Sequence, residues 1–394
     1  MKLLVKQRVS ELTADINFFL VFFFYVVFQV FIQVGYVEPH VVHSFSFILA
    51  LTIPVSILGL LVDRRVYALI KMPVVKAYVF FLVFYFFFVL YNFAIGVGLD
   101  HLIYHVKSVF RLVAFYLLTL NVYVGGAFDR RRNILTFLGV SFLIVILSVA
   151  EVLNIGSIYY EGGYFELDYQ MLAFLILFFW LGSAPAKNYL YELFLAFLLL
   201  GALYFLGART EFYMAFVLLV IRLFVIAKNR LLIVFFFIIS LSVLLHVAFF
   251  YVGVEALSNI RIFALLFEGA DASRSSRGDL TREAFNTISN YPFLGDFGGH
   301  DLGAYAHNLL SAWVDFGFFG FLYLVLLVFF PFIHALVNLN KARYSLYFSV
   351  ISCLSLLIVA FVLAKTYSYS MLSVALAYYG LWQLKQDGIE YGRG

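Results

Sequence analysis

Residues 74–97, VVKAYVFFLVFYFFFVLYNFAIGV, form a long apolar run in which Lys76 is the only charged residue. A transmembrane helix needs about 20 consecutive apolar residues, because the hydrocarbon core of a bilayer is about 30 Å thick. The run meets this length and is rich in Phe, which suits positions that face lipid. It therefore predicts a helix that crosses a membrane.

The composition of the whole chain agrees with that prediction. Of its 394 residues, 65% are hydrophobic and 12% are charged, and the mean hydropathy is +1.02. Soluble domains carry about 25% charged residues, so a water-soluble core could not hide this much apolar surface. The net charge of +4 does not indicate nucleic-acid binding, because most basic residues fall in short loops. The one cysteine, Cys353, lies inside an apolar run, where a small buried residue is expected.

The length criterion predicts about twelve spans, several of them short enough that two could instead form a re-entrant pair. The spans lie near 16–36, 41–62, 74–97, 102–124, 134–153, 169–184, 188–207, 212–227, 231–253, 306–337, 344–364 and 369–384. The first apolar run is too long for a signal-peptide core, so we expect it to be retained. The sequence thus predicts an all-α polytopic membrane protein with one transmembrane domain over residues 1–394. Within it, residues 254–305 form one large external loop with short helices.

The basic residues predict the orientation, because Lys and Arg favour cytoplasmic loops. They recur before the first predicted span and after every second one. The members are Lys2, Lys6, Arg8, Arg64, Arg65, Lys71, Arg130, Arg131, Arg132, Lys187, Lys228, Arg230, Lys341, Arg343, Lys385 and Arg393. We therefore expect both termini in the cytoplasm and the 254–305 loop on the opposite side.

Arg209 lies in the short external turn LGART, residues 206–210, between two predicted spans. A guanidinium at headgroup depth suits a phosphate, because its planar fork donates two parallel hydrogen bonds. The alternative is a structural role, in which Arg209 extends towards the interface or pairs with Glu211.

Arg274 and Arg277 lie in the external loop, just before or within the segment RGDLTREAFNTISNYP, residues 277–292. Ala284, Phe285 and Ile288 recur there at helical spacing, and Pro292 is expected to end the helix. If Arg277 opens this helix, its free N–H groups also favour an anion. The alternative is that these arginines are solvated and pair with acidic neighbours, namely Asp271, Asp279 and Glu283. For Arg282 we expect a structural or peripheral role, and for the glycines at 295, 298, 299 and 303 a flexible loop.

His307 stands with Asn308 where the polar loop enters a late span. An imidazole titrates near neutral pH and could take a proton from a sugar hydroxyl, although a packed structural histidine is the alternative. Gly317 and Gly320 are expected to allow close helix packing below it. Arg111 lies deeper in the 102–124 span and could reach the same external cavity.

Metal sites are not expected. His101 and His105 are four residues apart, but a polar face at the interface is the favoured interpretation of that spacing. The spacing of Asp296, His300 and Asp301 matches no metal-ligand pattern.

Three stretches in order resemble the superfamily of O-antigen polymerases and O-antigen ligases. They are GARTE at 207–211, SRGDLTREAFNTISNYPFLG at 276–295 and AHNLLSAWVDFGFFGF at 306–321. Eight residues separate the His-Asn pair from the first glycine of the third stretch, whereas the ligase pattern has nine. Ala208 also stands where Ser is frequent. The chain is therefore most similar to the polymerase branch.

The resemblance implies a GT-C-type glycosyltransferase in the bacterial inner membrane that acts at the periplasmic face without metal or cofactor. An undecaprenyl-diphosphate-linked oligosaccharide would serve as donor and acceptor, and a flippase and a chain-length-regulating membrane protein are possible partners. His307 would be the base, and Arg209, Arg277 and Arg274 would hold the diphosphate. The possible supporting residues are Asn308, Arg111, Arg282 and Glu211.

Three alternatives remain at the level of sequence. A ligase would use the same donor but transfer the glycan to lipid A-core. A transporter or flippase would need charges near mid-depth and paired broken spans, whereas the predicted spans have few such charges. A purely structural membrane protein would leave the basic residues of the external face unexplained.

Overall fold

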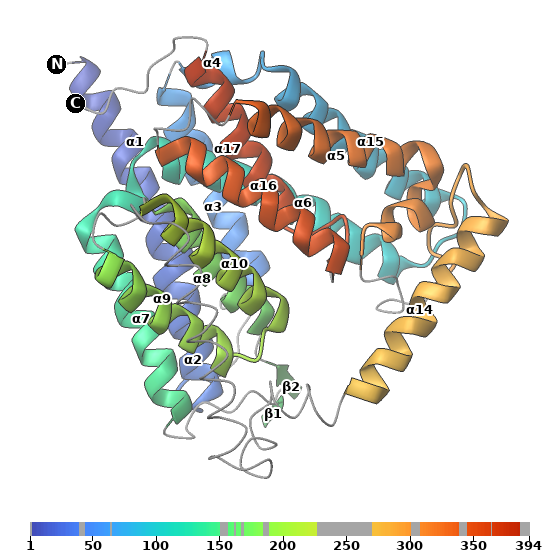
Figure 1. Ribbon diagram of the computed structural model, residues 1–394, viewed down its shortest axis with the longest axis horizontal. Helices are drawn as coiled ribbons and strands as arrows, with labels where there is room; N and C mark the ends of the chain where they lie inside the picture. Colours follow the sequence, from blue (N-terminus) through green and yellow to red (C-terminus); the bar gives the residue numbers. More distant parts are fainter. Residues whose placement is uncertain are drawn as a thin grey trace. The chain divides into compact units, whose positions relative to one another are not determined.

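A computed structural model of the protein describes residues 2–38, 44–63, 65–149, 157–160, 163–166, 169–183, 189–226, 270–300, 308–338, 345–363 and 365–386 (Figure 1). Within these ranges the regular structure is helical, apart from one antiparallel hairpin in which Ser157 pairs with Glu166 and Tyr160 with Gly163. The predicted span 231–253 and the loop residues 254–269 lie outside the described ranges.

Six helices among the described residues are long and apolar enough to cross a membrane. They are Lys6–Ile32, Phe45–Val62, Pro73–Ala94, Leu99–Val124, Arg131–Val149 and Leu310–Val337. Three shorter apolar helices also match predicted spans, namely Tyr169–Gly182, Leu190–Phe205 and Leu346–Val362. The prediction of a helical membrane protein is confirmed, whereas the count of twelve spans and the single transmembrane domain stay predictions.

The elements are named in chain order. They are α1 (Lys2–Phe18), the π-helical η1 (Phe19–Tyr25), α2 (Val26–Gln33), α3 (Phe45–Val62), α4 (Arg65–Leu69), α5 (Pro73–Ala94), α6 (Leu99–Val124), the 3-10 turn η3 (Ala127–Asp129), α7 (Arg131–Val149), β1 (Ser157–Tyr160), β2 (Gly163–Glu166), α8 (Tyr169–Gly182), α9 (Tyr189–Phe205), α10 (Arg209–Ile226), α14 (Ala270–Asn290), α15 (Leu310–Val337), α16 (Ser345–Leu363) and α17 (Met371–Gln386).

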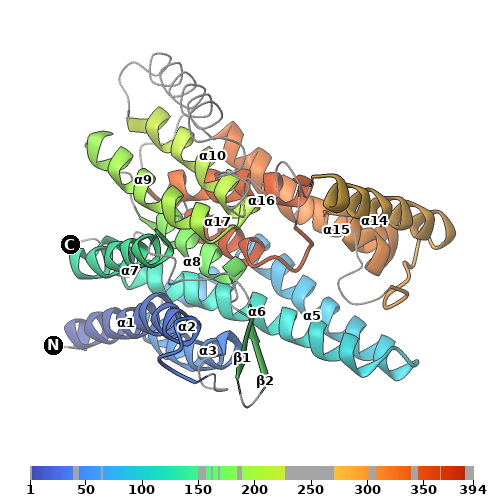
Figure 2. The same ribbon diagram turned by 90° about the horizontal axis from the view of Figure 1, so that it is seen from below.

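The chain divides into two compact units. The first unit comprises Met1–Val21, Ser44–Arg130 and Arg277–Gly394, and the second comprises Phe22–His43 and Arg131–Ser276. In the first unit α6 contacts α1, α3, α5 and α17, and α16 contacts both α15 and α17 (Figure 1). In the second unit α9 contacts α7, α8 and α10, and Figure 2 shows α9 beside α10.

Buried polar side chains join the helices of the first unit. Asn17 of α1 donates from Nδ2 to Ser56 Oγ at 2.8 Å and to Asn121 Oδ1 at 2.9 Å, which links α1 to α3 and α6. Asn121 Nδ2 in turn donates to Thr13 Oγ1 at 3.1 Å. Because apolar contacts alone discriminate poorly between helices in lipid, such hydrogen bonds help to fix which faces meet.

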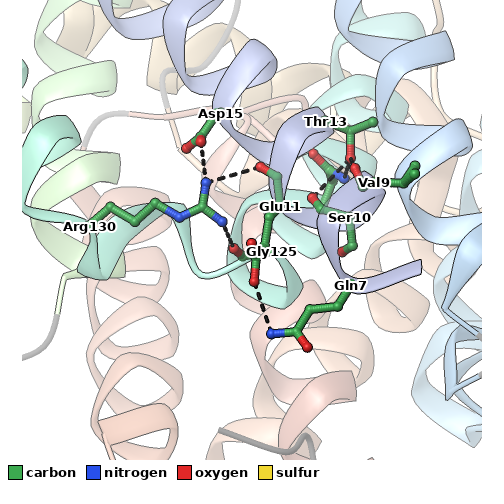
Figure 3. A network of polar contacts seen from close by, with 9 residues as sticks. Gln7, Val9, Ser10, Glu11, Thr13, Asp15, Gly125 and Arg130 are labelled. Carbon is green, nitrogen blue, oxygen red and sulfur yellow. Dashed lines mark hydrogen bonds and ion pairs between the residues drawn. The ribbon is translucent and has the colours of Figure 1, made fainter. Parts of the chain in front are cut away.

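Arg130 ties the end of α6 to α1 (Figure 3). Its guanidinium donates to Gly125 O at 2.6 Å and to Glu11 O at 3.1 Å, and it forms an ion pair with Asp15. Gly125 is the C-cap of α6, so Arg130 satisfies a carbonyl that the helix itself leaves open. One of the basic residues assigned to a cytoplasmic loop thus also holds two helices together.

A buried ion pair lies in the second unit. Arg222 of α10 pairs with Glu192 of α9, and both side chains are fully buried. Arg222 Nη1 also donates to Trp180 O at 2.8 Å and Ser183 O at 2.9 Å, while Trp180 Nε1 donates to Glu192 Oε1 at 3.1 Å. The sequence did not reveal this pair. Each residue is a single charge within a long apolar run, and nothing in either run indicates a partner in another helix.

The helix before Pro292 exists but begins earlier than predicted. It is α14, Ala270–Asn290, so Arg277 lies two turns inside it and does not open it. The expected help from free N–H groups near Arg277 is therefore wrong, because those groups belong to the first turn. Ala284 and Ile288 pack against Val314 and Leu310, as their helical spacing predicted, whereas Phe285 is exposed.

The role expected for Gly317 is also wrong. Gly317 has φ +69 and ψ −173, so α15 is broken there, and a Cβ at this position would overlap the carbonyl group of Phe293. The loop after α14 crosses α15 at this break, where Pro292 O accepts from Phe318 N at 2.9 Å and from Trp313 Nε1 at 2.8 Å. Gly317 therefore admits a crossing loop and does not serve ordinary helix packing.

Candidate functional site

Polar side chains from four parts of the first unit gather around one small cavity. The start of α6, the loop after α14, the first turns of α15 and the link between α16 and α17 all contribute. The lining residues are Tyr104, His105, His300, Ser311, Asp315, Thr366, Tyr367 and Ser368. The cavity has a volume of about 20 Å³, which is room for a water molecule or a hydroxyl group.

Asp315 is the acidic group of this cavity. It lies in α15, and its residue is 4% exposed. Its Oδ2 accepts a hydrogen bond from the Tyr367 hydroxyl at 2.7 Å, whereas Oδ1 has no hydrogen-bond partner among the residues that the structure describes. The imidazole of His300 lies beside the carboxylate, with Nε2 3.9 Å from Oδ1. A buried ionisable residue in a membrane helix is costly, and such residues generally mark functional sites.

Tyr367 stabilises the carboxylate from the α16–α17 link. Burial raises the pKa of its phenol well above the ordinary value, so the hydroxyl keeps its proton at neutral pH. A protonated phenol is the donor that the Asp315 carboxylate needs, and hydrogen bonds to charged groups are the stronger kind. The same hydroxyl lies 3.5 Å from His105 Nδ1, so it bridges the carboxylate and the imidazole.

His105 is held by the neighbouring α5 helix. Its Nδ1 is hydrogen-bonded to the Tyr85 hydroxyl at 2.7 Å, and its ring centroid lies 4.6 Å from that of Phe297. Phe297 belongs to the loop after α14, in which Gly295 and Gly298 have φ +73 and +78. These φ values favour glycine, as a turn requires. Gly303 lies outside the described residues, and the flexibility expected of this loop stays a prediction.

Two further imidazoles surround the cluster. His101 lies one turn before His105 in α6, with their ring centroids 6.4 Å apart, and its ring lies 6.3 Å from that of His300. Among the described residues no group of three or more His, Cys, Asp and Glu is arranged to hold a metal ion. The arrangement is suited instead to hydrogen bonding and to proton exchange between imidazole, phenol and carboxylate.

The expected base, His307, lies outside the described residues. Asn308, its neighbour in the chain, lies two residues before α15. Its Oδ1 accepts from Leu310 N at 2.9 Å and its carbonyl accepts from Ser311 Oγ at 2.8 Å. Ser311 lines the cavity. The His-Asn motif therefore leads directly, along the chain, into the wall of this site.

Arg111 also lies at this end of the first unit. It is partly buried on α6, and it interacts electrostatically with the Tyr85 phenol. Arg111 is not among the described residues that line the cavity, so the expectation that it reaches the cavity stays a prediction. Arg282 is exposed on α14.

For the other expected phosphate ligands, Arg209, Arg274 and Arg277, the structure describes the course of the backbone. Arg209 opens α10 after a turn in which Gly207 has φ +67, as the expected short turn requires, and Glu211 in its first turn is 1% exposed. Arg274 and Arg277 are three residues apart within α14 and so share a helix face. Arg209, Glu211 and Arg274 belong to the second unit and Arg277 to the first, so the convergence of Arg209 with Arg277 stays a prediction.

No protein-family model, curated protein or solved structure matches the chain. The resemblance in three short stretches therefore stays a prediction that rests on the residues alone.

Sequence reasoning missed Asp315, Tyr367 and Tyr85. For Asp315 a signal was present, because it is a lone acid within an apolar span and follows Ser311 by four residues. That spacing places the two residues on one helix face. The two tyrosines gave no signal, since the chain has 28 tyrosines and most predicted spans contain some.

Proposed function

We propose that the protein is a membrane glycosyltransferase of the O-antigen polymerase type, with GT-C-like architecture and about twelve spans. It moves a growing glycan from undecaprenyl diphosphate onto a new lipid-linked repeat unit. The reaction takes place at the periplasmic face of the bacterial inner membrane, and both termini are cytoplasmic. A flippase supplies the lipid-linked units, and a chain-length-regulating membrane protein is a second partner.

What carries the proposal is the buried cluster around Asp315 at the head of α15. The His-Asn motif directly precedes α15 in the chain. The helix that contains Arg277, α14, is followed by the loop in which His300 lies. The third motif stretch thus supplies Ser311 and Asp315 to this polar site, and His300 follows the end of the second stretch by five residues. Ionisable groups are not placed in such surroundings without a use.

The transfer needs two kinds of group. Negative charge that builds up on the departing diphosphate is stabilised by guanidinium groups already in position, which Arg209, Arg277 and Arg274 supply. The acceptor hydroxyl loses its proton to His307 while its oxygen forms the new glycosidic bond and the diphosphate leaves. Both requirements are met without a metal ion.

The experiment is a gel assay of polymer length in cells that lack the chromosomal gene and carry variants at equal protein level. His307→Ala and Arg277→Ala are expected to abolish the polymer ladder, and Arg277→Lys is expected to fail as well, because a lysine cannot form the bidentate contact. Arg131→Ala, an exposed arginine at the start of α7, is the control. Ladders of normal length in the His307 and Arg277 variants would refute the proposal.

Ligation to lipid A-core is the alternative, because it uses the same donor chemistry. Loss of a polymerase leaves core carrying a single repeat unit. Loss of a ligase leaves bare core and polymer still attached to the carrier lipid. The lipid-linked sugars that accumulate in a deletion strain therefore separate the two activities. A transporter is less well supported, because the buried Arg222 has Glu192 as a full partner and needs no cargo to neutralise it.

A further inference from the structure

We propose that the cavity beside Asp315 binds one hydroxyl group of the acceptor sugar, with Asp315 Oδ1 as the hydrogen-bond acceptor. This proposal rests on the glycosyltransferase function above and concerns Asp315, to which the resemblance assigns no role.

The first support is the unused oxygen of a buried carboxylate. Asp315 Oδ2 is satisfied by Tyr367, but Oδ1 has no hydrogen-bond partner among the described residues, and the side chain is 6% exposed. A buried acceptor without a donor is strongly unfavourable, so native structures nearly always satisfy such an atom with protein, water or ligand. At 3.9 Å, His300 Nε2 is too distant to donate directly. The site therefore calls for a donor of its own.

The second support is the chemistry of the walls. Apart from Asp315, the described lining consists of side chains with a hydroxyl group or an imidazole. The hydroxyl residues are Tyr104, Ser311, Thr366, Tyr367 and Ser368. One carboxylate disfavours an anion such as a phosphate, and a single carboxylate among hydroxyls is a poor site for a divalent ion. Neutral donors and acceptors at close range are what a hydroxyl group requires.

The third support is size. A volume of about 20 Å³ admits one hydroxyl group or water molecule but not a whole sugar ring. The sugar would therefore insert a single hydroxyl, while the rest of the acceptor remains outside the cavity. In the absence of acceptor, a water molecule has the same chemistry and is the expected resting occupant, which a sugar hydroxyl would displace.

The test uses full-length protein in detergent, with the lipid-linked repeat unit from the deletion strain as donor and acceptor. A panel of acceptors, each lacking one hydroxyl of its terminal sugar, serves as probe. With wild type, one deoxy acceptor should show a KM raised by about 10-fold or more, the usual loss when a hydrogen bond to a charged group is removed. In Asp315→Asn, the intact acceptor should show the same rise, and the deoxy acceptor should then be no worse than the intact one. The kcat should change much less than KM.

The control variant and the acceptor KM separate failure of this inference from failure of the proposed function. Asp100→Asn removes an exposed carboxylate at the start of α6 and should leave every KM unchanged. If Asp315→Asn does not fold, Thr366→Val removes a cavity hydroxyl without touching the carboxylate and should raise the KM of the intact acceptor several-fold. If wild type transfers sugar but neither variant alters the acceptor KM, the cavity holds only water and this inference is wrong. If wild type transfers no sugar, the proposed function itself fails.

Discussion

The backbone of Gly295 lies against the backbone of Gly317. A Cβ added to Gly295 would stand 2.6 Å from Gly317 N, closer than real Cβ atoms approach any atom. Asp296 N donates to Val314 O at 2.6 Å beside this contact. The loop that carries Phe297 and His300 to the cavity is therefore fixed to α15 through two residues that have no side chain.

Gly317→Ala tests this crossing. The residue has φ +69, and an added Cβ would overlap the Phe293 carbonyl, so backbone strain and a steric clash act together. We expect a loss of about 2–4 kcal/mol in the free energy of unfolding, seen as a lower Tm in detergent. Gly139→Ala in α7 is the control. It meets open space inside a helix and should be neutral or gain up to about 1 kcal/mol. A Gly317→Ala protein as stable as wild type would show that the loop does not cross here.

The sequence predicted the helices well and the contacts between them poorly. Apolar runs such as 74–97 show the length of a span directly, and α5 indeed covers Pro73–Ala94. The helix before Pro292 was found from the spacing of Ala284 and Ile288. Its start was misplaced, because the residues from Ala270 to Ser276 have no apolar periodicity that would reveal a helix.

At the candidate site, too, the sequence indicates individual residues but not the contacts between them. The sequence draws attention to His105 and His300 only as metal ligands, which the spacing disfavours. In the chain 195 positions separate them, and their meeting depends on how α6, α15 and the Gly295 loop pack. The sequence around a residue does not show which residue of another helix it contacts. The break at Gly317 was taken for ordinary packing, because Gly-x-x-Gly spacing is typical of close helix contacts.

Tyr367→Phe, at a residue that lines the cavity, is expected to destabilise the folded protein. The change removes the hydrogen bond to Asp315 Oδ2 and leaves a second carboxylate oxygen without a donor. Hydrogen bonds to charged groups contribute about 1.5–3 kcal/mol, and we expect a loss of that size in the free energy of unfolding. Tyr36→Phe, an exposed tyrosine in the other unit, should have no effect. Equal Tm values for the Tyr367 and Tyr36 variants would contradict the contact.

Tyr367 should also make the folding stability depend on pH, and the direction of this effect follows from its raised pKa. Burial raises the pKa of folded Tyr367, so above about pH 10 the unfolded chain releases this proton while the folded protein retains it. The unfolded state then binds fewer protons, and stability falls as pH rises, by about 1.4 kcal/mol per pH unit for one such group. Tyr367→Phe should therefore lose stability less steeply than wild type between about pH 10 and pH 11. Parallel curves, measured by chemical denaturation, would show that Tyr367 ionises normally.

Arg130 should stabilise the first unit through geometry more than through charge. Its fork reaches Gly125 O, Glu11 O and Asp15 together, which a single ammonium cannot do. Arg130→Lys should thus lower the free energy of unfolding by about 1–2 kcal/mol although the charge is unchanged. Arg131→Lys, at an exposed position one residue later, is the matched control. A lysine variant at 130 that unfolds like wild type would show that only the charge matters.

The pair of Arg222 and Glu192 allows the sharpest energetic test, because removal of one partner differs from removal of both. Glu192→Leu leaves Arg222 fully buried without its counter-ion, which should cost about 3–5 kcal/mol. In Arg222→Met with Glu192→Leu, no uncompensated charge remains. That double variant should therefore be more stable than Glu192→Leu alone, although Trp180 Nε1 loses its acceptor. Unfolding by heat in detergent, with all variants at equal concentration, measures the difference. A double variant less stable than Glu192→Leu alone would mean that the carbonyl contacts of Arg222 to Trp180 and Ser183, and not its pairing with Glu192, hold α10 to its neighbours.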